Sequence, residues 1–193
     1  MKKVFCLFVC LFASSANATV LTFDDLETAG GGATTGLSSY TDLGYQLTTS
    51  NTFAYWNQGH SNYNTSAGLF NNAPNGMTRL SAVDNSLFDL NSIDLDTVYS
   101  DNGPSPIAFL GYDSNDQLIA TENISLNSDG WVTLLFSSLF SDLAYVEWAQ
   151  TSSYHHFDNV TINESVSVPE PSSLALFGLG LAGLGFARKQ KKA

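Results

Sequence analysis

The sequence predicts an all-β domain, built as a two-sheet antiparallel sandwich or jelly roll. Short runs of β-branched and aromatic residues recur between residues 19 and 168, and Asn, Asp, Gly, Ser and Pro separate them. No helical period of apolar residues runs through this region. About ten such runs suit two sheets whose inner faces make one core.

The candidate strands follow one another with turn residues between them. They are residues 20–23, 45–48, 52–56, 77–83, 87–90, 93–98, 105–112, 117–125, 131–136, 144–149 and 157–162. The clearest hairpin has its turn at Asp113 to Asp116, where four polar turn-formers follow an apolar run. The apolar phase slips between Leu90 and Ile93, which predicts a bulge near Asn91 and Ser92.

Two stretches are predicted as loops. Residues 27–39 contain Gly30, Gly31 and Gly32, which indicates a flexible loop. Residues 57–76 hold six Asn and three Gly with little periodicity, and they are too long for a plain connector. We expect this Asn-rich segment to be a surface excursion.

Charge is distributed very unevenly along the 193 residues. Six of the seven basic residues lie at the two ends, and between Thr19 and Val168 the only base is Arg79. That stretch has 17 acidic residues and therefore a net charge of −16. Such a charge repels polyphosphates, so nucleic acid is excluded as a partner.

The N-terminus has the three parts of a secretory signal. Lys2 and Lys3 precede an apolar run at 4–13, and Ala16, Asn17 and Ala18 form an A-x-A site, so signal peptidase is expected to cut before Thr19. Cleavage removes both cysteines, Cys6 and Cys10, and leaves the mature chain without a thiol or disulfide. The alternative, a lipoprotein signal, needs a small residue where Val9 stands.

The C-terminus shows the same kinds of segment in reverse order. Val168, Pro169, Glu170 and Pro171 precede an apolar run at 174–187. The apolar run predicts a transmembrane helix. At about 21 Å this helix is shorter than the hydrocarbon core of a membrane, which is about 30 Å thick, so it spans the membrane only marginally. The basic end should stay cytoplasmic and place everything before Pro169 outside. Its bases are Arg188, Lys189, Lys191 and Lys192.

This tail resembles the PEP-CTERM protein-sorting signal of Gram-negative bacteria that produce exopolysaccharide, a segment also labelled "ice-binding protein C-terminal domain". The resemblance implies recognition by an exosortase-type membrane protease-transpeptidase, removal of the tail near Pro169 to Pro171, and delivery to the cell surface or extracellular matrix. A simple membrane tail, the alternative, leaves the Pro-Glu-Pro motif unexplained. The predicted parts are a signal peptide (1–18), a sandwich ectodomain (19–168) and a sorting tail (169–193).

The ectodomain also resembles lectin-like and carbohydrate-module sandwiches, through its first segment (22–26) and its last (154–160). In such folds the first and last strands are neighbours. Their meeting would bring together hard oxygen ligands of the kind that Ca²⁺ takes, so a structural calcium site is one interpretation of these residues. The candidate ligands are Asp24, Asp25, Asp158 and Asn159. The favoured interpretation is a set of Asx turns at strand ends, with no cofactor required.

Aromatic residues near the Asn-rich segment are candidates for contact with sugar rings. They are Tyr55, Trp56 and Tyr63, with His60 beside them. Alternatively, aromatic residues such as Phe53, Trp131 and Trp148 simply fill the core. Asp94 and Asp96 share a strand face, which we expect to be solvated.

No catalytic motif accompanies the three histidines. His155 and His156 are adjacent, so on a strand their imidazoles point to opposite faces. We therefore expect a non-enzymatic surface or matrix protein, either structural or binding extracellular polysaccharide. A secreted hydrolase acting on polysaccharide remains the alternative, because paired carboxylates need only proximity in the fold.

Overall fold

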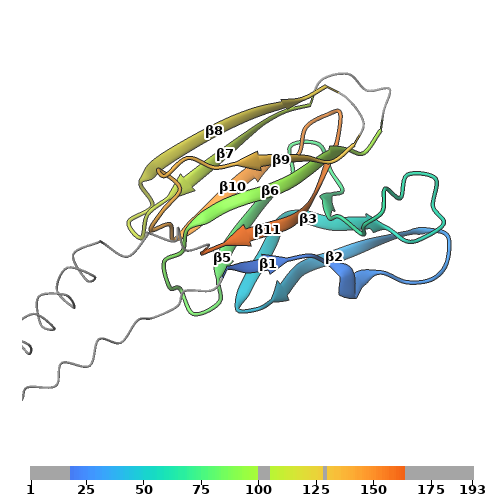
Figure 1. Ribbon diagram of the computed structural model, residues 1–193, viewed down its shortest axis with the longest axis horizontal. Helices are drawn as coiled ribbons and strands as arrows, with labels where there is room; N and C mark the ends of the chain where they lie inside the picture. Colours follow the sequence, from blue (N-terminus) through green and yellow to red (C-terminus); the bar gives the residue numbers. More distant parts are fainter. Residues whose placement is uncertain (1–17, 100–104, 128–129, 164–193) are drawn as a thin grey trace, which may run out of the picture.

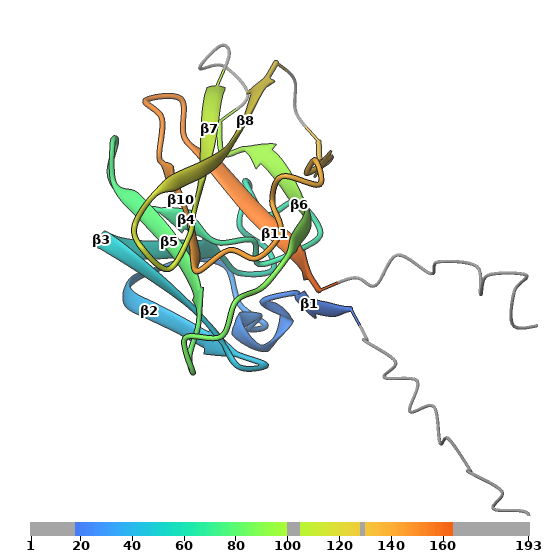
Figure 2. The ribbon, with the colours of Figure 1, turned by 90° about the vertical axis from the view of Figure 1, so that its left-hand side faces the viewer.

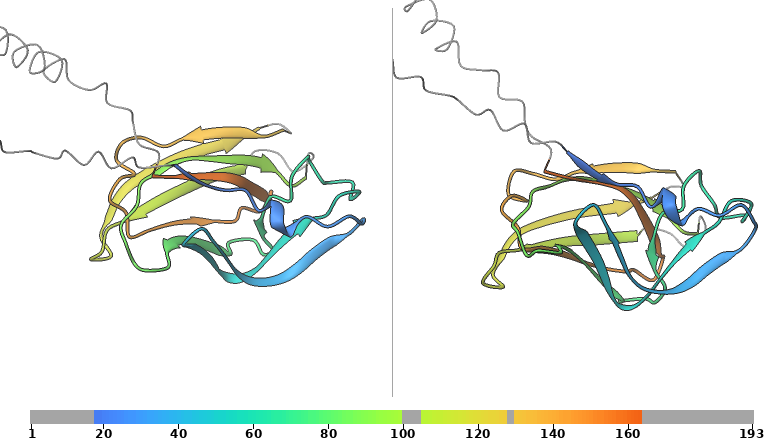
Figure 3. Two further views of the ribbon diagram at one scale, coloured as in Figure 1. Left: turned by 60° about the horizontal axis from the view of Figure 1, so that its bottom comes forward. Right: turned by 90° about the horizontal axis from the view of Figure 1, so that it is seen from below.

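The computed structural model describes residues 18–99, 105–127 and 130–163, and within these it forms the expected sandwich of two antiparallel sheets (Figure 1). Both layers are visible in Figure 3. The predicted signal-peptide helix and the predicted transmembrane helix lie outside the described residues. No helix within the described ranges combines the length and the apolar character needed to cross a membrane.

The smaller sheet contains both the first and the last strand. Its order is β1 (Thr19–Leu21), β11 (His155–Ile162), β6 (Leu90–Thr97) and β9 (Val132–Leu135). β1 and β11 pair antiparallel, with Thr19 opposite Ile162. The prediction that the first and last strands are neighbours is therefore confirmed.

The larger sheet has seven strands. Its order is β2 (Ala33–Asp42), β3 (Tyr45–Trp56), β5 (Met77–Ala82), β10 (Tyr145–Ala149), β7 (Ser105–Tyr112) and β8 (Leu118–Leu126), and β4 (Phe70–Asn71) pairs with β3 outside this path. A single 3-10 turn, η1 (Asp24–Leu26), follows β1 in the described part of the chain.

Phe157, on the middle of β11, joins the two sheets at the centre of the core. Its ring makes edge contacts with Phe53 at 6.3 Å and with Trp148 at 5.1 Å between centroids, and both of those side chains come from the larger sheet. Phe53 and Trp148 thus fill the core, whereas Trp131 is only half-buried.

Two local predictions from the sequence are confirmed. β7 and β8 form the hairpin, in which an Asp113 carboxylate oxygen accepts hydrogen bonds from the backbone N–H groups of Asn115 and Gln117. The register between β6 and β11 slips near Asn91, because Ser92 pairs with Thr161 while Leu90 pairs with Ile162. This slip is the irregularity that the apolar phase predicted.

Several strand boundaries were predicted wrongly. Residues 33–39 are the first part of β2 and not a flexible loop. β2 lies at the edge of its sheet and is mostly polar, so it lacks the apolar alternation that would have identified it. The runs at 45–48 and 52–56 form one strand, β3. The predicted strand at 87–90 is a single bridge between Phe88 and Leu143.

The Asn-rich segment, residues 57–76, is less exposed than a surface excursion should be. Its residues 67–71 are all buried, and Phe70 and Asn71 form β4 against β3. Leu69 hydrogen-bonds through its backbone to Phe157 on β11. Residues 67–71 therefore belong to the core, whereas Asn72, Pro74 and Asn75 after them are exposed and the first half of the segment lies mostly on the surface.

Candidate functional site

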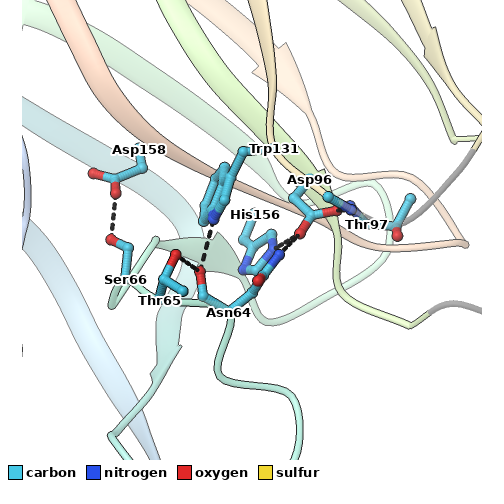
Figure 4. A network of polar contacts seen from close by, with 9 residues as sticks. Asn64, Thr65, Ser66, Asp96, Thr97, Trp131, His156 and Asp158 are labelled. Atoms are coloured by element: carbon cyan, nitrogen blue, oxygen red, sulfur yellow. Dashed lines mark hydrogen bonds and ion pairs between the residues drawn. The ribbon is translucent and has the colours of Figure 1, made fainter.

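Three carboxylates hold the Asn-rich segment on the domain. Glu27 accepts hydrogen bonds from the Tyr63 hydroxyl at 2.8 Å and from the backbone N–H of Ala67 at 3.1 Å. Asp96 accepts one from the Asn64 amide at 2.5 Å, and Asp158 accepts one from the Ser66 hydroxyl. Figure 4 shows the last two contacts on the outer face of the smaller sheet. This segment is therefore ordered by acidic side chains that lie far from it in the sequence.

Asp96 is the most heavily bonded of these carboxylates. One of its oxygens accepts hydrogen bonds from the backbone N–H groups of Thr97 and Gly130, at 2.7 and 2.8 Å. Its other oxygen faces Asn64 Nδ2 and lies 3.3 Å from His156 Nε2. Asp96 is only 2% exposed, so the expectation that it lies on a solvated face is wrong. Because both oxygens are occupied by donors, this carboxylate positions its neighbours.

An indole completes the cluster. Trp131 stacks on His156 with ring centroids 4.5 Å apart, and its Nε1 donates to the backbone oxygen of Asn64 at 2.7 Å. The ring also lies over Gly68, where an added Cβ would come within 2.5 Å of Trp131. Gly68 is thus required by the close approach of this ring.

The titration behaviour of these groups follows from burial and hydrogen bonding. Burial raises the pKa of Asp96, but the hydrogen bonds that it accepts outweigh this, so its pKa lies below the usual value. Burial, with the charges of Asp24 and Asp94, raises the pKa of Asp158 to about 6. Burial lowers the pKa of His155 to about 3, which keeps that imidazole neutral.

An open pocket of about 260 Å³ lies between the first half of the Asn-rich segment and the end of β6. It is lined by Ser61, Asn62, Tyr63, Asn64, Asp96, Thr97 and Val98. Hydroxyl and amide groups dominate this lining, and the ring of Tyr63 packs beside it against a second small hydrophobic cluster that includes Trp56 and Val98. We call this the Asn64 pocket. Its chemistry suits a ligand rich in hydroxyl groups.

A second hollow, of about 380 Å³, lies over strands β5, β7 and β10 of the larger sheet. Side chains such as Met77, Leu110 and Pro106 line it. On the same sheet the guanidinium of Arg79 pairs with Glu147 at 2.7 Å and lies 4.0 Å from the centre of the Tyr145 ring. The apolar part of its lining makes this hollow the less suitable one for a polar ligand.

Of the four residues predicted for sugar contact, Tyr63 is the one that lines the Asn64 pocket. Tyr55 belongs to the main core. Trp56 is buried and stacks on His60 with centroids 4.1 Å apart, so that His60 covers one face of the indole.

The four predicted calcium ligands make separate contacts. Asp25 accepts a hydrogen bond from the Tyr40 hydroxyl, and the Asn159 amide donates to Asp94. Asp24 lies close enough to Asp158 for its charge to raise the pKa of that residue. Within the described ranges no three His, Cys, Asp or Glu side chains converge as metal ligands. The calcium site stays a prediction.

Sequence reasoning missed Glu27, Asn64, Asp96 and Trp131 as members of one site. The sequence places Asp96 beside Asp94 on one strand face, but in the structure Asp96 is buried whereas Asp94 is half-exposed. Asn64, 32 residues away, reaches Asp96 and removes it from water. No local pattern carries that information, because the contact depends on how the Asn-rich segment folds back.

Comparison with known families gives a match at the C-terminus. Residues 167–189 match the PEP-CTERM protein-sorting motif, which bears out the resemblance of the tail. This range contains Val168, Pro169, Glu170, Pro171, Arg188 and Lys189, all outside the described residues, as are Lys191, Lys192 and Ala16. Thr19, at the predicted cleavage site next to Ala18, begins β1. The motif marks an exported protein that is processed at the membrane.

The sandwich fold of the ectodomain is shared with a solved structure. A DUF4465 family protein from Bacteroides caccae superposes with a TM-score of 0.54 at 13% identity, over 77% of this chain and 100% of that one. A family 29 carbohydrate-binding module from Piromyces equi gives a TM-score of 0.46 at 11% identity, over 80% of this chain and 95% of that one. At these identities the likeness concerns the sandwich alone. Among curated proteins, none matches this chain.

Proposed function

We propose that this exported sandwich protein, sorted through its PEP-CTERM motif, acts at the cell surface or in the extracellular matrix by binding a neutral polysaccharide in the Asn64 pocket. The observation that carries the proposal is the lining of the pocket, which combines amide and hydroxyl residues with the aromatic residue Tyr63. Sugar rings offer hydroxyl groups to such amides and an apolar face to such a ring.

The electrostatics favour a neutral polymer. Residues 19–168 carry a net charge of −16, so an acidic polysaccharide would be repelled along its whole length. Asp96 is the one carboxylate that lines the pocket among the described residues, and both of its oxygens already accept hydrogen bonds. Asp96 therefore orients Asn64 and is not available as a general base.

The alternative function, hydrolysis of a polysaccharide, needs two carboxyl groups flanking the bond that breaks. A pocket lined by a single, fully bonded carboxylate favours binding over catalysis. No metal or cofactor is needed for the proposed binding.

A glycan array with the exported chain tests the proposal. Wild type should retain neutral glycans, and Asn62→Ala should weaken binding by about tenfold, the loss expected for one hydrogen bond to the ligand. Asn123→Ala, an exposed amide on β8 in the larger sheet, is the matched control and should bind like wild type. Equal binding by both variants would remove the Asn64 pocket from consideration. Release of reducing sugar from a bound glycan would instead favour the hydrolase.

Orientation has its own test. A cysteine at Ser114, exposed in the β7–β8 turn, should react with an impermeant maleimide on whole cells. Reaction only after lysis would contradict the placement of residues 19–168 outside the membrane.

A further inference from the structure

Exposed apolar side chains gather on the loops at the end of the sandwich where the described chain begins and ends. Leu43 is 62% exposed and Leu139 is 63% exposed, and Val83 and Leu87 are also well exposed. These side chains come from the β2–β3 turn, the β5–β6 loop and the loop before β10. We call them the terminal apolar tips. Figure 2 looks onto this end of the molecule.

Hydrogen bonds join the loops that carry these tips into one surface. Val83 N donates to Gly44 O at 2.9 Å, which places the Val83 loop beside the Leu43 turn. Leu90 N donates to Phe140 O at 2.9 Å, and Asp142 N donates to an Asp89 carboxylate oxygen at 2.9 Å. The loop that carries Leu87 is thereby tied to the loop that carries Leu139.

Asn163, the last described residue, is fixed within this surface. Its backbone N–H donates to Asp89 O at 2.9 Å, and its side-chain amide donates to the Tyr45 hydroxyl at 2.7 Å. The sorting motif begins only a few residues later, at residue 167. Pro169 is six positions after Asn163, and a fully extended chain covers about 20 Å over that length. Any enzyme that cuts the tail near Pro169 must therefore work close to this end of the folded domain.

We propose that the terminal apolar tips are the surface on which the membrane protease that reads the sorting motif docks against the folded domain. The matching partner surface is apolar with a basic rim, because Asp42, Asp84, Asp89 and Asp142 lie among the tips. The same acids disfavour anionic lipid headgroups as the occupant. The Asn-rich segment, whose first half lines the Asn64 pocket, lies at the opposite end of the sandwich (Figure 1), so docking leaves the pocket open.

The test follows removal of the tail from the full chain in a host that carries the protease, by mass spectrometry of the C-terminus over time. Leu43→Asn, Leu87→Asn and Leu139→Asn together should slow removal by about tenfold, since a few apolar anchors dominate most interfaces. The control variant, Tyr99→Ser with Val132→Thr, removes exposed apolar groups from the other end of the domain, and its tail should be removed as fast as that of wild type. Normal processing of the triple variant, or equal slowing of the control, would overturn the proposal.

Two further measurements separate the alternatives. Asp84→Lys with Asp142→Lys should slow removal if the partner has a basic rim, whereas faster removal would assign the tips to anionic lipid and overturn the proposal. If the triple variant does not fold, Leu43→Asn alone takes its place, because Leu43 has a φ of 48°, a conformation that Asn adopts readily. A wild-type chain that keeps its tail would overturn this proposal and leave polysaccharide binding standing.

Discussion

His156 and Asp96 lie directly opposite each other across the β11–β6 pair, with Nε2 of the imidazole 3.3 Å from Oδ2 of the carboxylate. Both side chains are almost completely buried, at 1% and 2% exposure. The next opposed pair on the same face is Asp158 with Asp94, two carboxylates. One face of a small sheet therefore holds an attractive pair beside a repulsive one, and the two should respond differently to substitution.

The attractive pair leads to the first prediction. Asp96→Asn should lower the free energy of unfolding by about 2 kcal/mol, because hydrogen bonds to a buried charged acceptor are lost or misdirected. Asp94→Asn is the comparison and should cost less, since the weaker hydrogen bonds from Thr133 and Asn159 are offset by the removal of a charge opposite Asp158. Urea denaturation measures both. If both variants lose the same free energy of unfolding, the hydrogen bonds to Asp96 contribute no more to stability than those to Asp94.

The repulsive pair leads to a prediction about pH. The pKa of Asp158 is about 6 in the folded protein, above its value in an unfolded chain, so its favourable contribution is complete below about pH 4 and is lost as pH rises through 6. Two pKa units correspond to about 3 kcal/mol. The melting temperature of Asp158→Asn should therefore be higher than that of wild type at pH 7.5 and equal to it at pH 4. Because burial lowers the pKa of His155 to about 3, this histidine destabilises both proteins equally as pH falls, so the comparison isolates Asp158. A difference independent of pH would refute this account.

Calcium gives the third prediction. If Ca²⁺ binds near Asp24 and Asp158, millimolar CaCl₂ should raise the melting temperature more than NaCl of matched ionic strength, by a stabilisation of about 2.7 kcal/mol at a hundredfold excess over the dissociation constant. Asp158→Asn should lose the calcium-specific part and keep the salt part. A wild-type protein that responds equally to both salts has no such site.

Gly68 provides a steric prediction. Gly68→Ala places a Cβ within 2.5 Å of the Trp131 ring and 3.2 Å of the Phe157 carbonyl oxygen, so it should cost about 1–3 kcal/mol and alter tryptophan fluorescence. Gly31→Ala is the matched control, because the nearest atom to its Cβ is at an ordinary 3.6 Å. Unchanged fluorescence in Gly68→Ala would show that Trp131 does not lie over this glycine.

The tail provides the last prediction. Replacing Pro169, Glu170 and Pro171 by Ala leaves the apolar run unchanged. If the tail is a simple membrane anchor, the variant should stay in the membrane like wild type, whereas a sorting protease should fail to cut it. Mass spectrometry of the mature C-terminus distinguishes the two. An intact Arg188 to Ala193 end on the wild-type protein, in a host with the protease, would contradict sorting.

The order of residues alone predicted the fold class, the hairpin at Asp113 and the slip near Asn91, because period-two alternation and turn residues are local signals. It also determined the sorting motif, which is a contiguous pattern. The burial of Asp96 beside half-exposed Asp94, and the stacking of Trp131 on His156, follow from the tertiary fold. These outcomes depend on the Asn-rich segment folding over one sheet face, where Asn64 meets an acid 32 residues away. Removing both groups from water costs free energy, and the hydrogen bond between them offsets that cost only after the fold has brought them together, so no local pattern in the chain encodes the contact.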